Sequence, residues 1–283
     1  MTNATLSLVR DGFIFPEGLR WRDGQLWLSD MWDHAVYRLD ASGELERICT
    51  VPQRPSGLGF LPDGTLLISS MADRSLYRLE KSGLVLHGDL SALATGDLND
   101  LLVDGQGGAY VGNFGYDLFG GAAPVRAKLS LVTPDGAVRE VADDLDFPNG
   151  MVLLDEGRVL VVAETWSNKL TAFDRSADGS LSNRRVYAAL GERTPDGICA
   201  DAEDGIWVSS FTTGEFIRLS REGELTDRHE CGGRAVACVL GGSDGRTLFC
   251  ATFNGGIEDI HALKRAGMVS TTRVSIPAQP FAW

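Results

Sequence analysis

The hydrophobic and polar residues of this chain follow a repeated pattern of short apolar runs and tight turns. In the first unit, runs at 18–21, 26–28, 35–39 and 44–49 are separated by turns such as Asp23-Gly24. Runs of this length between Asp-Gly and Ser-Gly turns predict β-strands joined into antiparallel hairpins. Helical periodicity is confined to two short stretches, 90–94 and 257–264. The pattern therefore predicts an all-β protein.

The same unit returns six times along the chain. Four copies begin with proline, an oxygen-bearing residue and glycine, namely Pro16-Glu17-Gly18, Pro55-Ser56-Gly57, Pro148-Asn149-Gly150 and Pro195-Asp196-Gly197. Looser copies surround Asn99 and Ala235, and the middle residues of the six copies are 39, 43, 50, 47 and 39 residues apart. Four-stranded units of about 40–50 residues are typical of propeller blades. We expect residues 1–283 to form one domain, a six-bladed β-propeller with four antiparallel strands per blade and a central channel.

Two other all-β architectures fit the pattern less well. A β-sandwich does not produce sixfold self-similarity, and a β-helix has a much shorter repeat. Residues 4–9 precede the first copy and have no place in the first blade. We expect them to pair beside 268–276 in the last blade, which would close the ring and protect its edges.

Composition narrows the range of partners. The formal net charge is −13, which disfavours nucleic acid and anionic membranes as partners. The five cysteines form no C-x-x-C motif, so we expect free thiols in a reducing compartment. The first eleven residues lack the apolar stretch of a signal peptide, and no apolar run approaches membrane-spanning length. We expect a cytoplasmic protein that is a monomer or a weak homo-oligomer.

The repeats place oxygen-bearing side chains at one level of the expected channel. In a propeller the innermost strand of each blade starts at the channel, so Glu17, Asn149 and Asp196 should converge at one mouth, with Ser56 and Asn99 at the same level. Carboxylate and amide oxygens suit a hard divalent cation. We expect one ion, with Ca²⁺ favoured and Mg²⁺, Mn²⁺, Zn²⁺ and Fe²⁺ left open. The alternative is that each copy is only a turn, because Asn-Gly and Asp-Gly are common turn dipeptides.

Other polar residues are expected to play lesser roles. Asp30, Asn113 and Glu164 end the second strand of their units and could support the site from behind. The four histidines, His34, His87, His229 and His261, share no spacing and are expected in exposed loops or strand ends. No G-x-S-x-G or P-loop motif occurs.

The third unit carries a long loop, 114–124, that is rich in glycine and aromatic residues. Such a loop is either a plain surface connection or a wall of a binding pocket, and exposed aromatics favour the second. We therefore expect Asn113, Phe114, Tyr116 and Phe119 to contact a substrate.

These motifs resemble the senescence marker protein / gluconolactonase / luciferin-regenerating enzyme family. The resemblance rests on Pro16-Glu17-Gly18, Asn99-Asp100, Phe147-Pro148-Asn149-Gly150, Ala163-Glu164-Thr165 with Asn168, and Pro195-Asp196-Gly197, in order over nearly the whole chain. It implies a six-bladed propeller with one catalytic divalent metal, and most characterised members hydrolyse lactones. It further implies Glu17, Asn149 and Asp196 as metal ligands, and Asp196 as the catalytic group that also takes a proton from the attacking water. Asn99 is implied as a catalytic residue that either contacts the substrate or stands as a fourth residue beside the metal.

One position departs from this family. Sugar-lactone members often carry arginine two residues before the Asn of the Asn-Asp pair, where this chain has Asp97. Asp97 is therefore a candidate substrate contact of a different kind, and a less polar, aromatic or alkyl-bearing lactone is the expected substrate. Two other functions stay open, a phosphotriester hydrolase on the same metal and a non-catalytic binding propeller with a structural Ca²⁺.

Overall fold

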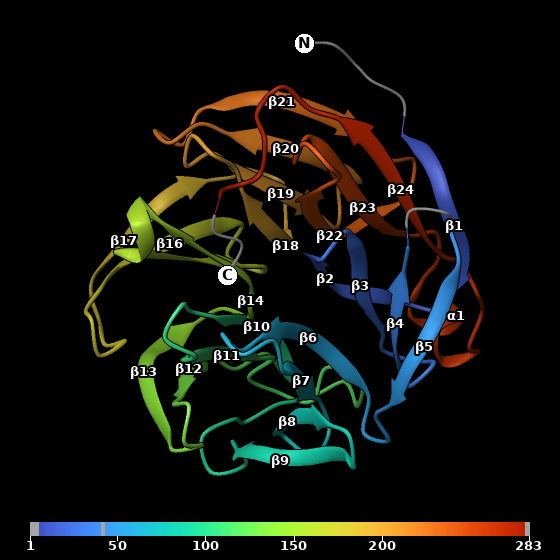
Figure 1. Cartoon of the computed structure of the whole chain (residues 1–283). Helices are drawn as coiled ribbons and strands as arrows, with labels where there is room; N and C mark the ends of the chain where they lie inside the picture. Colours follow the sequence, from blue (N-terminus) through green and yellow to red (C-terminus); the bar gives the residue numbers. More distant parts are fainter. Residues whose placement is uncertain (1–5, 41–42, 281–283) are drawn as a thin grey trace.

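The chain forms a ring of six four-stranded antiparallel sheets around a central channel (Figure 1). This is seen in a computed structural model that describes residues 6–40 and 43–280. The prediction of a six-bladed β-propeller is confirmed. The first three blades contain β2 (Pro16–Arg22), β3 (Gln25–Asp30), β4 (Ala35–Leu39) and β5 (Leu45–Thr50); β6 (Pro55–Phe60), β7 (Leu66–Ser70), β8 (Ser75–Glu80) and β9 (Gly83–Asp89); and β10 (Leu98–Val103), β11 (Ala109–Asn113), β12 (Ala127–Val132) and β13 (Val138–Leu145).

The other three blades follow the same plan. They contain β14 (Pro148–Leu154), β15 (Val159–Glu164), β16 (Lys169–Arg175) and β17 (Leu181–Ala189); β18 (Pro195–Ala200), β19 (Ile206–Ser210), β20 (Glu215–Leu219) and β21 (Leu225–Glu230); and β22 (Arg234–Gly241), β23 (Thr247–Phe253), β24 (Gly267–Arg273) and β1 (Ser7–Phe13). In the described residues, helix is limited to α1 (Ile257–His261) and a 3₁₀ turn, η1 (Asp155–Gly157). Of the two predicted helical stretches, only the second contains a helix.

The ring closes with the N-terminal strand, as predicted. β1 pairs antiparallel with β24 and forms the outermost strand of the sixth blade (Figure 1). Ser7 lies opposite Thr271 and Phe13 opposite Gly267, which shifts the pairing a few residues from the expected register. Residues 4 and 5 of the predicted strand lie outside the described residues. The sixth blade is thus built from both ends of the chain.

The hydrophobic core lies in the gaps between neighbouring blades. For example, Val161 and Leu170 of the fourth blade pack with Ile198 and Val208 of the fifth. Comparable clusters of buried residues fill the other gaps. Each blade therefore buries its apolar faces only by stacking on its neighbours, as the repeat pattern implied.

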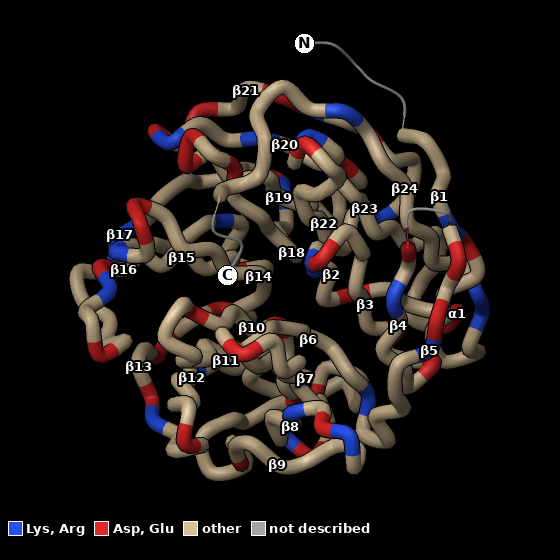
Figure 2. The backbone as a smooth tube through the Cα atoms, in the orientation of Figure 1, with Lys and Arg blue, Asp and Glu red and all other residues tan. Residues whose placement is uncertain are grey.

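Charged residues are spread over the rim of the ring. Lys and Arg alternate with Asp and Glu along the outer strands and loops of the blades (Figure 2). Among the described residues, no helix is long and apolar enough to cross a membrane.

The six inner strands share an irregularity at the position of the Pro-x-Gly motif, which four of them carry. The pairing of each inner strand with the next strand slips near the motif, between Glu17 and Arg20 in β2 and between Pro148 and Met151 in β14. The same shift occurs in β6, β10, β18 and β22. A bulge of this kind redirects side chains. The motif is therefore a repeated bulge at the start of each inner strand, and not only a turn.

The glycine of the motif permits close contact between blades. A Cβ on Gly18 would lie 2.4 Å from the Ser56 carbonyl oxygen of the second blade, and one on Gly150 would lie 2.5 Å from the Ile198 nitrogen of the fifth. These distances leave no space for a side chain. The third blade has Asp100 at this position.

Candidate active site

A cavity of about 360 Å³ lies at the channel mouth where the inner strands begin. The first residue of each inner strand pairs with the end of the second strand, as in Pro16 opposite Asp30 and Pro148 opposite Glu164. Strand starts and strand ends therefore meet on the same face of the ring. The lining residues are Phe15, Glu17, Met31, Trp32, Asn99, Phe114, Leu118, Phe119, Phe147, Asn149, Thr165, Trp166, Asp196, Phe211, Arg234, Phe253, Gly256, Ile257 and Ile260.

The three predicted metal ligands line this one cavity. Glu17, Asn149 and Asp196 come from the first, fourth and fifth blades and are 5%, 4% and 6% exposed. Burial, with the nearby charges of Asp196 and Asp100, raises the pKa of Glu17 well above its usual value. Burial also raises the pKa of Asp196, although a hydrogen bond from the Asn149 side chain opposes the rise. Two buried carboxylates in one cavity are unfavourable without a compensating positive charge.

Among the described residues, the amide of Asn149 forms a hydrogen bond through its nitrogen but not through its oxygen. Its Nδ2 donates to Thr165 Oγ1 at 3.2 Å, while its Oδ1 is buried and has no hydrogen-bond partner among the described residues. A buried carbonyl oxygen without a donor is costly unless something else binds it. Together with the carboxylates of Glu17 and Asp196, this oxygen makes a donor set that fits a hard divalent ion.

The donor set combines two carboxylates with an amide. Within the described residues there is no cluster of three or more His, Cys, Asp or Glu side chains that could hold a metal. The site is therefore distinct from a zinc centre built on His and Cys, and its composition favours ions that prefer oxygen ligands.

Asn99 also lies in the cavity wall, at the same level of the third blade. Its Nδ2 donates to the Pro148 carbonyl at 3.1 Å, and Ser56 Oγ lies 3.5 Å from its Oδ1. The neighbouring Asp100 lies beyond the cavity lining, where it accepts from Arg20 Nη2 at 2.9 Å across the channel. Arg20 thus pairs with Asp100, although the charge of Asp100 still contributes to the raised pKa values of Glu17 and Asp196.

The carboxylates of Asp30 and Glu164 hydrogen-bond to the turns that carry aromatic residues of the cavity wall. Asp30 accepts from the backbone N–H groups of Ile14 and Phe15 at 2.7 and 2.9 Å. Glu164 accepts from the N–H of Asp146 at 2.8 Å, next to Phe147. These are the supporting roles predicted for both residues, and their effect is to fix the cavity residues Phe15 and Phe147.

An aromatic cluster forms the wall beside the third and fourth blades. Phe147, with a left-handed φ of 58°, stacks on Phe114 at a centroid distance of 4.5 Å and contacts Trp166 at 5.3 Å. A bulky residue in this conformation is strained and has to be held by its surroundings. Phe119 packs edge-on against Trp32 at 5.2 Å. The loop after the third blade's second strand therefore contributes Phe114, Leu118 and Phe119 to the cavity. Contact of the two phenylalanines with a substrate stays a prediction.

Three predicted substrate contacts lie outside the cavity lining. Asn113 bonds to the backbone, donating to the Lys128 carbonyl and accepting from the Gly115 N–H, both at 2.9 Å. Tyr116 uses its hydroxyl to accept from Trp166 Nε1 at 2.9 Å. Asp97 forms an ion pair with Arg54, whose guanidinium lies over the rings of Trp32 and Phe119. These three residues support the wall of the cavity from outside.

The sequence analysis missed several lining residues and misplaced two histidines. The sequence analysis did not single out Trp32, Trp166, Phe211 or Arg234, which all line the cavity. A positional signal existed, because Trp32 and Trp166 both stand two residues after the acid that ends a second strand. His87 and His229 are buried and not exposed as expected, and His229 stacks on Trp207. Burial lowers the pKa of His87.

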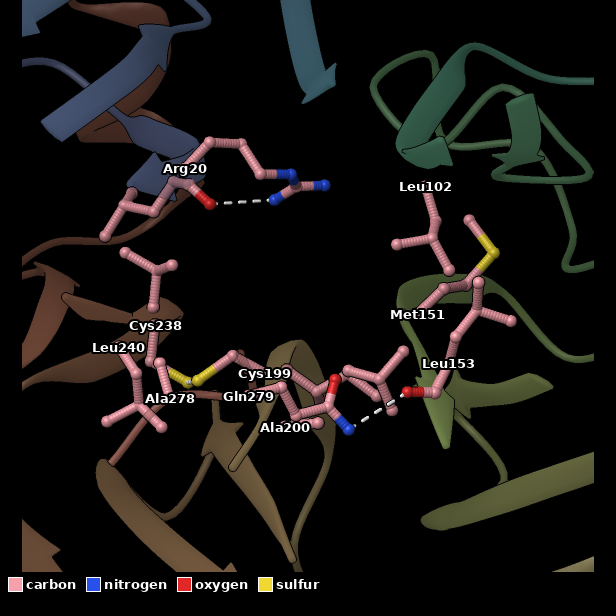
Figure 3. A pocket seen from close by; sticks show the side chains of 14 residues that line it. Arg20, Leu102, Met151, Leu153, Cys199, Ala200, Cys238, Leu240, Ala278 and Gln279 are labelled. Atoms are coloured by element: carbon pink, nitrogen blue, oxygen red, sulfur yellow. Dashed lines mark hydrogen bonds between the residues drawn. The ribbon is translucent and has the colours of Figure 1, made fainter. Parts of the chain in front are cut away.

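The opposite mouth of the channel has a different character. Later residues of the same inner strands enclose about 80 Å³ there, including Arg20, Leu102, Met151 and Leu240 (Figure 3). Cys199 and Cys238 face each other with Sγ atoms 3.8 Å apart, and Gln279 Nε2 donates to the Leu153 carbonyl at 3.3 Å. This mouth is small and mostly apolar, so the oxygen-rich chemistry is confined to the other end.

Fold and site together define a six-bladed propeller with a buried oxygen-donor site at one channel mouth. Residues 15–254 match the SMP-30/Gluconolactonase/LRE-like region. The chain therefore belongs to the SMP-30/gluconolactonase/LRE-like family, which confirms the resemblance seen in its motifs.

Similar proteins cover the chain to different extents. Regucalcin from Bos taurus is 26% identical over 191 residues, a match that spans 64% of this chain and 64% of the bovine protein, less than two thirds of its length. The calcium-binding protein regucalcin from Agrobacterium tumefaciens superposes with a TM-score of 0.82 at 21% identity, covering 99% of this chain and 97% of that one. A gluconolactonase from Xanthomonas campestris gives 0.78 at 22%, covering 96% and 89%. At these identities the structural likeness shows the fold alone.

Proposed function

We propose that this protein is a divalent-metal-dependent hydrolase that opens a lactone. The observation that carries the proposal is the convergence of Glu17, Asp196 and the unpartnered Asn149 Oδ1 in one cavity of a family that includes gluconolactonases. An interaction-only propeller has no need for a donor set at the base of a substrate-sized cavity. Ca²⁺ is the proposed ion, because all three ligands supply oxygen and a regucalcin with this fold binds calcium.

The lining residues divide the work of hydrolysis. A dication held by Glu17, Asn149 and Asp196 would polarise the lactone carbonyl and stabilise the negative charge that develops on its oxygen. Asp196 accepts the proton of the attacking water, whose oxygen bonds to the carbonyl carbon. The ring C–O bond then breaks, and the released ring oxygen takes up the proton from Asp196, which gives a hydroxy acid and restores the Asp196 carboxylate. Asn99 keeps one amide N–H free of Pro148 to donate to the ester oxygens.

The cavity walls indicate the kind of lactone. Aromatic and aliphatic side chains make up most of the lining, and the ion pair of Arg54 with Asp97 lies outside it. Few hydroxyl-binding groups face the substrate, so we propose an aromatic or alkyl-bearing lactone as substrate, in preference to a sugar lactone. An apolar wall also excludes bulk water and strengthens the polar interactions at the site.

The test measures metal content and hydrolysis in the same samples. Metal-stripped protein is reloaded with Ca²⁺, Mg²⁺, Mn²⁺, Zn²⁺ or Fe²⁺ and assayed on dihydrocoumarin, alkyl lactones and gluconolactone. We expect Glu17→Gln and Asp196→Asn each to lower metal occupancy and to reduce kcat/KM by at least about 100-fold. Asp63→Asn, which changes an exposed hairpin turn, serves as the control. Full activity in metal-stripped protein or in either site variant would overturn the mechanism, and faster turnover of gluconolactone than of all apolar lactones would overturn the substrate class.

A further inference from the structure

Arg234 is the one cationic side chain among the described residues that line the cavity. It begins the inner strand of the sixth blade and pairs with Phe253, the place that Pro16 takes opposite Asp30 in the first blade. The next residue, Ala235, stands where other blades carry Glu17, Asn149 and Asp196. The sixth blade therefore replaces a metal-ligand position with alanine and presents an arginine beside it.

The contacts of Arg234 with the described residues hold its guanidinium in place but do not involve the two terminal nitrogens. Nε donates to the Gly255 carbonyl at 3.0 Å, and the guanidinium lies over the Phe211 ring, with Cζ 4.9 Å from the ring centroid. In the described part of the chain, no carboxylate lies within ion-pair distance of Arg234, and its two terminal nitrogens have no hydrogen-bond partner. Arginines nearby are paired, Arg54 with Asp97 and Arg193 with Glu215.

Charge and polarity around Arg234 both favour an anionic ligand. A dication would neutralise the carboxylates of Glu17 and Asp196, which leaves the positive charge of Arg234 in the cavity. The wall on its side is apolar, with Phe15 packed against Phe211 and Phe253 at centroid distances of 6.5 and 5.2 Å. In such a setting a guanidinium gains most from a planar anion that accepts from both terminal nitrogens.

We propose that Arg234 binds a carboxylate on the substrate, so that the protein selects lactones that carry an acidic group on an apolar body. This rests on the proposed lactone hydrolysis. Arg234 acts as a specificity-determining residue, and its loss affects recognition of the acidic group but not opening of the lactone ring. A neutral lactone of the same shape leaves the guanidinium unpaired, which is the arrangement that gives strong discrimination.

The experiment compares dihydrocoumarin with its ring-carboxylated derivatives, which are positional isomers of one another. The proteins are the metal-loaded wild type, Arg234→Met, Arg234→Lys and the surface control Arg221→Met. We expect the best carboxylated isomer to exceed dihydrocoumarin in kcat/KM by about 10- to 100-fold in the wild type, as expected for a hydrogen-bonded charge. Arg234→Met should abolish this preference mainly through KM and leave dihydrocoumarin turnover within about 3-fold. Arg234→Lys should retain part of the preference, because it keeps the charge but loses the planar fork.

A binding arm separates this proposal from lactone hydrolysis itself. The carboxylated lactam analogues, 3,4-dihydroquinolin-2-ones, are titrated into the same proteins by calorimetry, with the uncarboxylated lactam as reference. Carboxylate-dependent binding that disappears in Arg234→Met supports the role of Arg234. If this binding is seen but no lactone is turned over, the role of Arg234 stands and the proposed lactone hydrolysis is wrong. Equal preference for acidic and neutral compounds in wild type and Arg234→Met, with hydrolysis intact, overturns the role of Arg234 alone.

Discussion

At the scale of single residues, the Pro-x-Gly motif gives each of its positions a separate task. The middle residue faces the cavity in Glu17, Asn149 and Asp196, and the glycine lies against the backbone of the next blade. Because glycine has no Cβ, it permits this close contact at Gly18, Gly57, Gly150 and Gly197. Gly18 also has a left-handed φ of 59°, which glycine adopts without strain. The middle residue has no such constraint, so it can carry chemistry.

Replacing Gly18 tests the closeness of the blades. Gly18 and Gly24 both have left-handed φ values, 59° and 76°, but a Cβ on Gly24 meets no atom of the described residues within 4 Å. We expect Gly24→Ala to cost about 1–2 kcal/mol through backbone strain. Gly18→Ala should cost a further 1–3 kcal/mol or so, because the added methyl group overpacks the contact with Ser56. Urea unfolding of the two variants measures the difference, and equal losses would show that blade contact does not require glycine.

Glu164 makes stability depend on pH. Burial raises the pKa of Glu164, but hydrogen bonds from Thr171 and the Asp146 N–H and the positive charge of Lys169 outweigh it and lower the pKa from 4.5. The ions facing it are Lys169 at 3.3 Å, Arg184 at 3.2 Å and Arg126 at 3.7 Å. A lowered folded pKa means stabilisation that is complete above the unfolded value and lost as the pH falls through the folded one.

Glu164→Gln should therefore be less stable than wild type at pH 7, and the gap should narrow as the pH falls below about 4.5, the ordinary pKa of the group. The free energy of unfolding at pH 7, 5 and 4 measures this. A gap that stays constant or widens at low pH would contradict the assignment of Glu164 as an ionised partner of these cations.

At the scale of elements, hydroxyl groups in or directly after the second strand of one blade bond to the inner strand of the next and so tie the two blades together. Ser29 donates to the Ser56 carbonyl at 2.6 Å, Ser69 to the Asn99 carbonyl at 2.7 Å, and Thr165 to the Pro195 carbonyl at 2.8 Å. The ties from Ser69 and Thr165 fix the strand starts that carry the cavity residues Asn99 and Asp196. In the fourth blade the same hydroxyl also accepts from Asn149, so the tie and the candidate metal site share one atom.

Thr165→Val removes this shared atom while keeping the side-chain shape. Without Thr165 Oγ1, the Asn149 amide loses the contact that directs its oxygen toward the proposed ion. We expect a 10- to 100-fold loss of Ca²⁺ affinity, a typical cost of removing such a support. Ser69→Ala removes the equivalent tie in the second blade and should leave Ca²⁺ affinity nearly unchanged. Calorimetric titration of both variants decides the point, and similar affinities would assign the Thr165 hydroxyl a structural role only.

Repeat spacing predicted the elements well, but it did not predict the cavity walls. The Pro-x-Gly copies and Asp-Gly turns are local signals, so blade number and strand order follow from them. Trp32 and Trp166 lie in loops, where hydrophobicity alone does not distinguish a core residue from a cavity residue. Asp97 was expected in the cavity, but its partner Arg54 is 43 residues away, and only the fold shows the pair.

At the scale of the whole molecule, the ring depends on a strand contributed from the far end of the chain. β1 covers the outer edge of β24, so the sixth blade is complete only when both ends of the sequence are present. This closure has a high sequence separation and therefore forms late or at high entropic cost in folding.

Shortening the N-terminus should destabilise the entire propeller. Deletion of residues 1–10 removes Ser7, Leu8 and Arg10 from the β1–β24 ladder and exposes an unpaired strand edge. We expect a drop in Tm of at least about 5 °C and a greater tendency to aggregate. Deletion of residues 1–5, which leaves that ladder intact, is the control. Equal Tm values for the two deletions would show that the ring is held without its N-terminal strand.

The repeated bulge provides six equivalent residue positions around the channel mouth, one on each inner strand. A substitution at one of these positions, such as Ser56 or Ala235, changes the side chain at the channel while the strand that carries it is retained. In such a molecule a new chemical function can arise by substitution at one bulge position at a time, while the propeller fold stays the same.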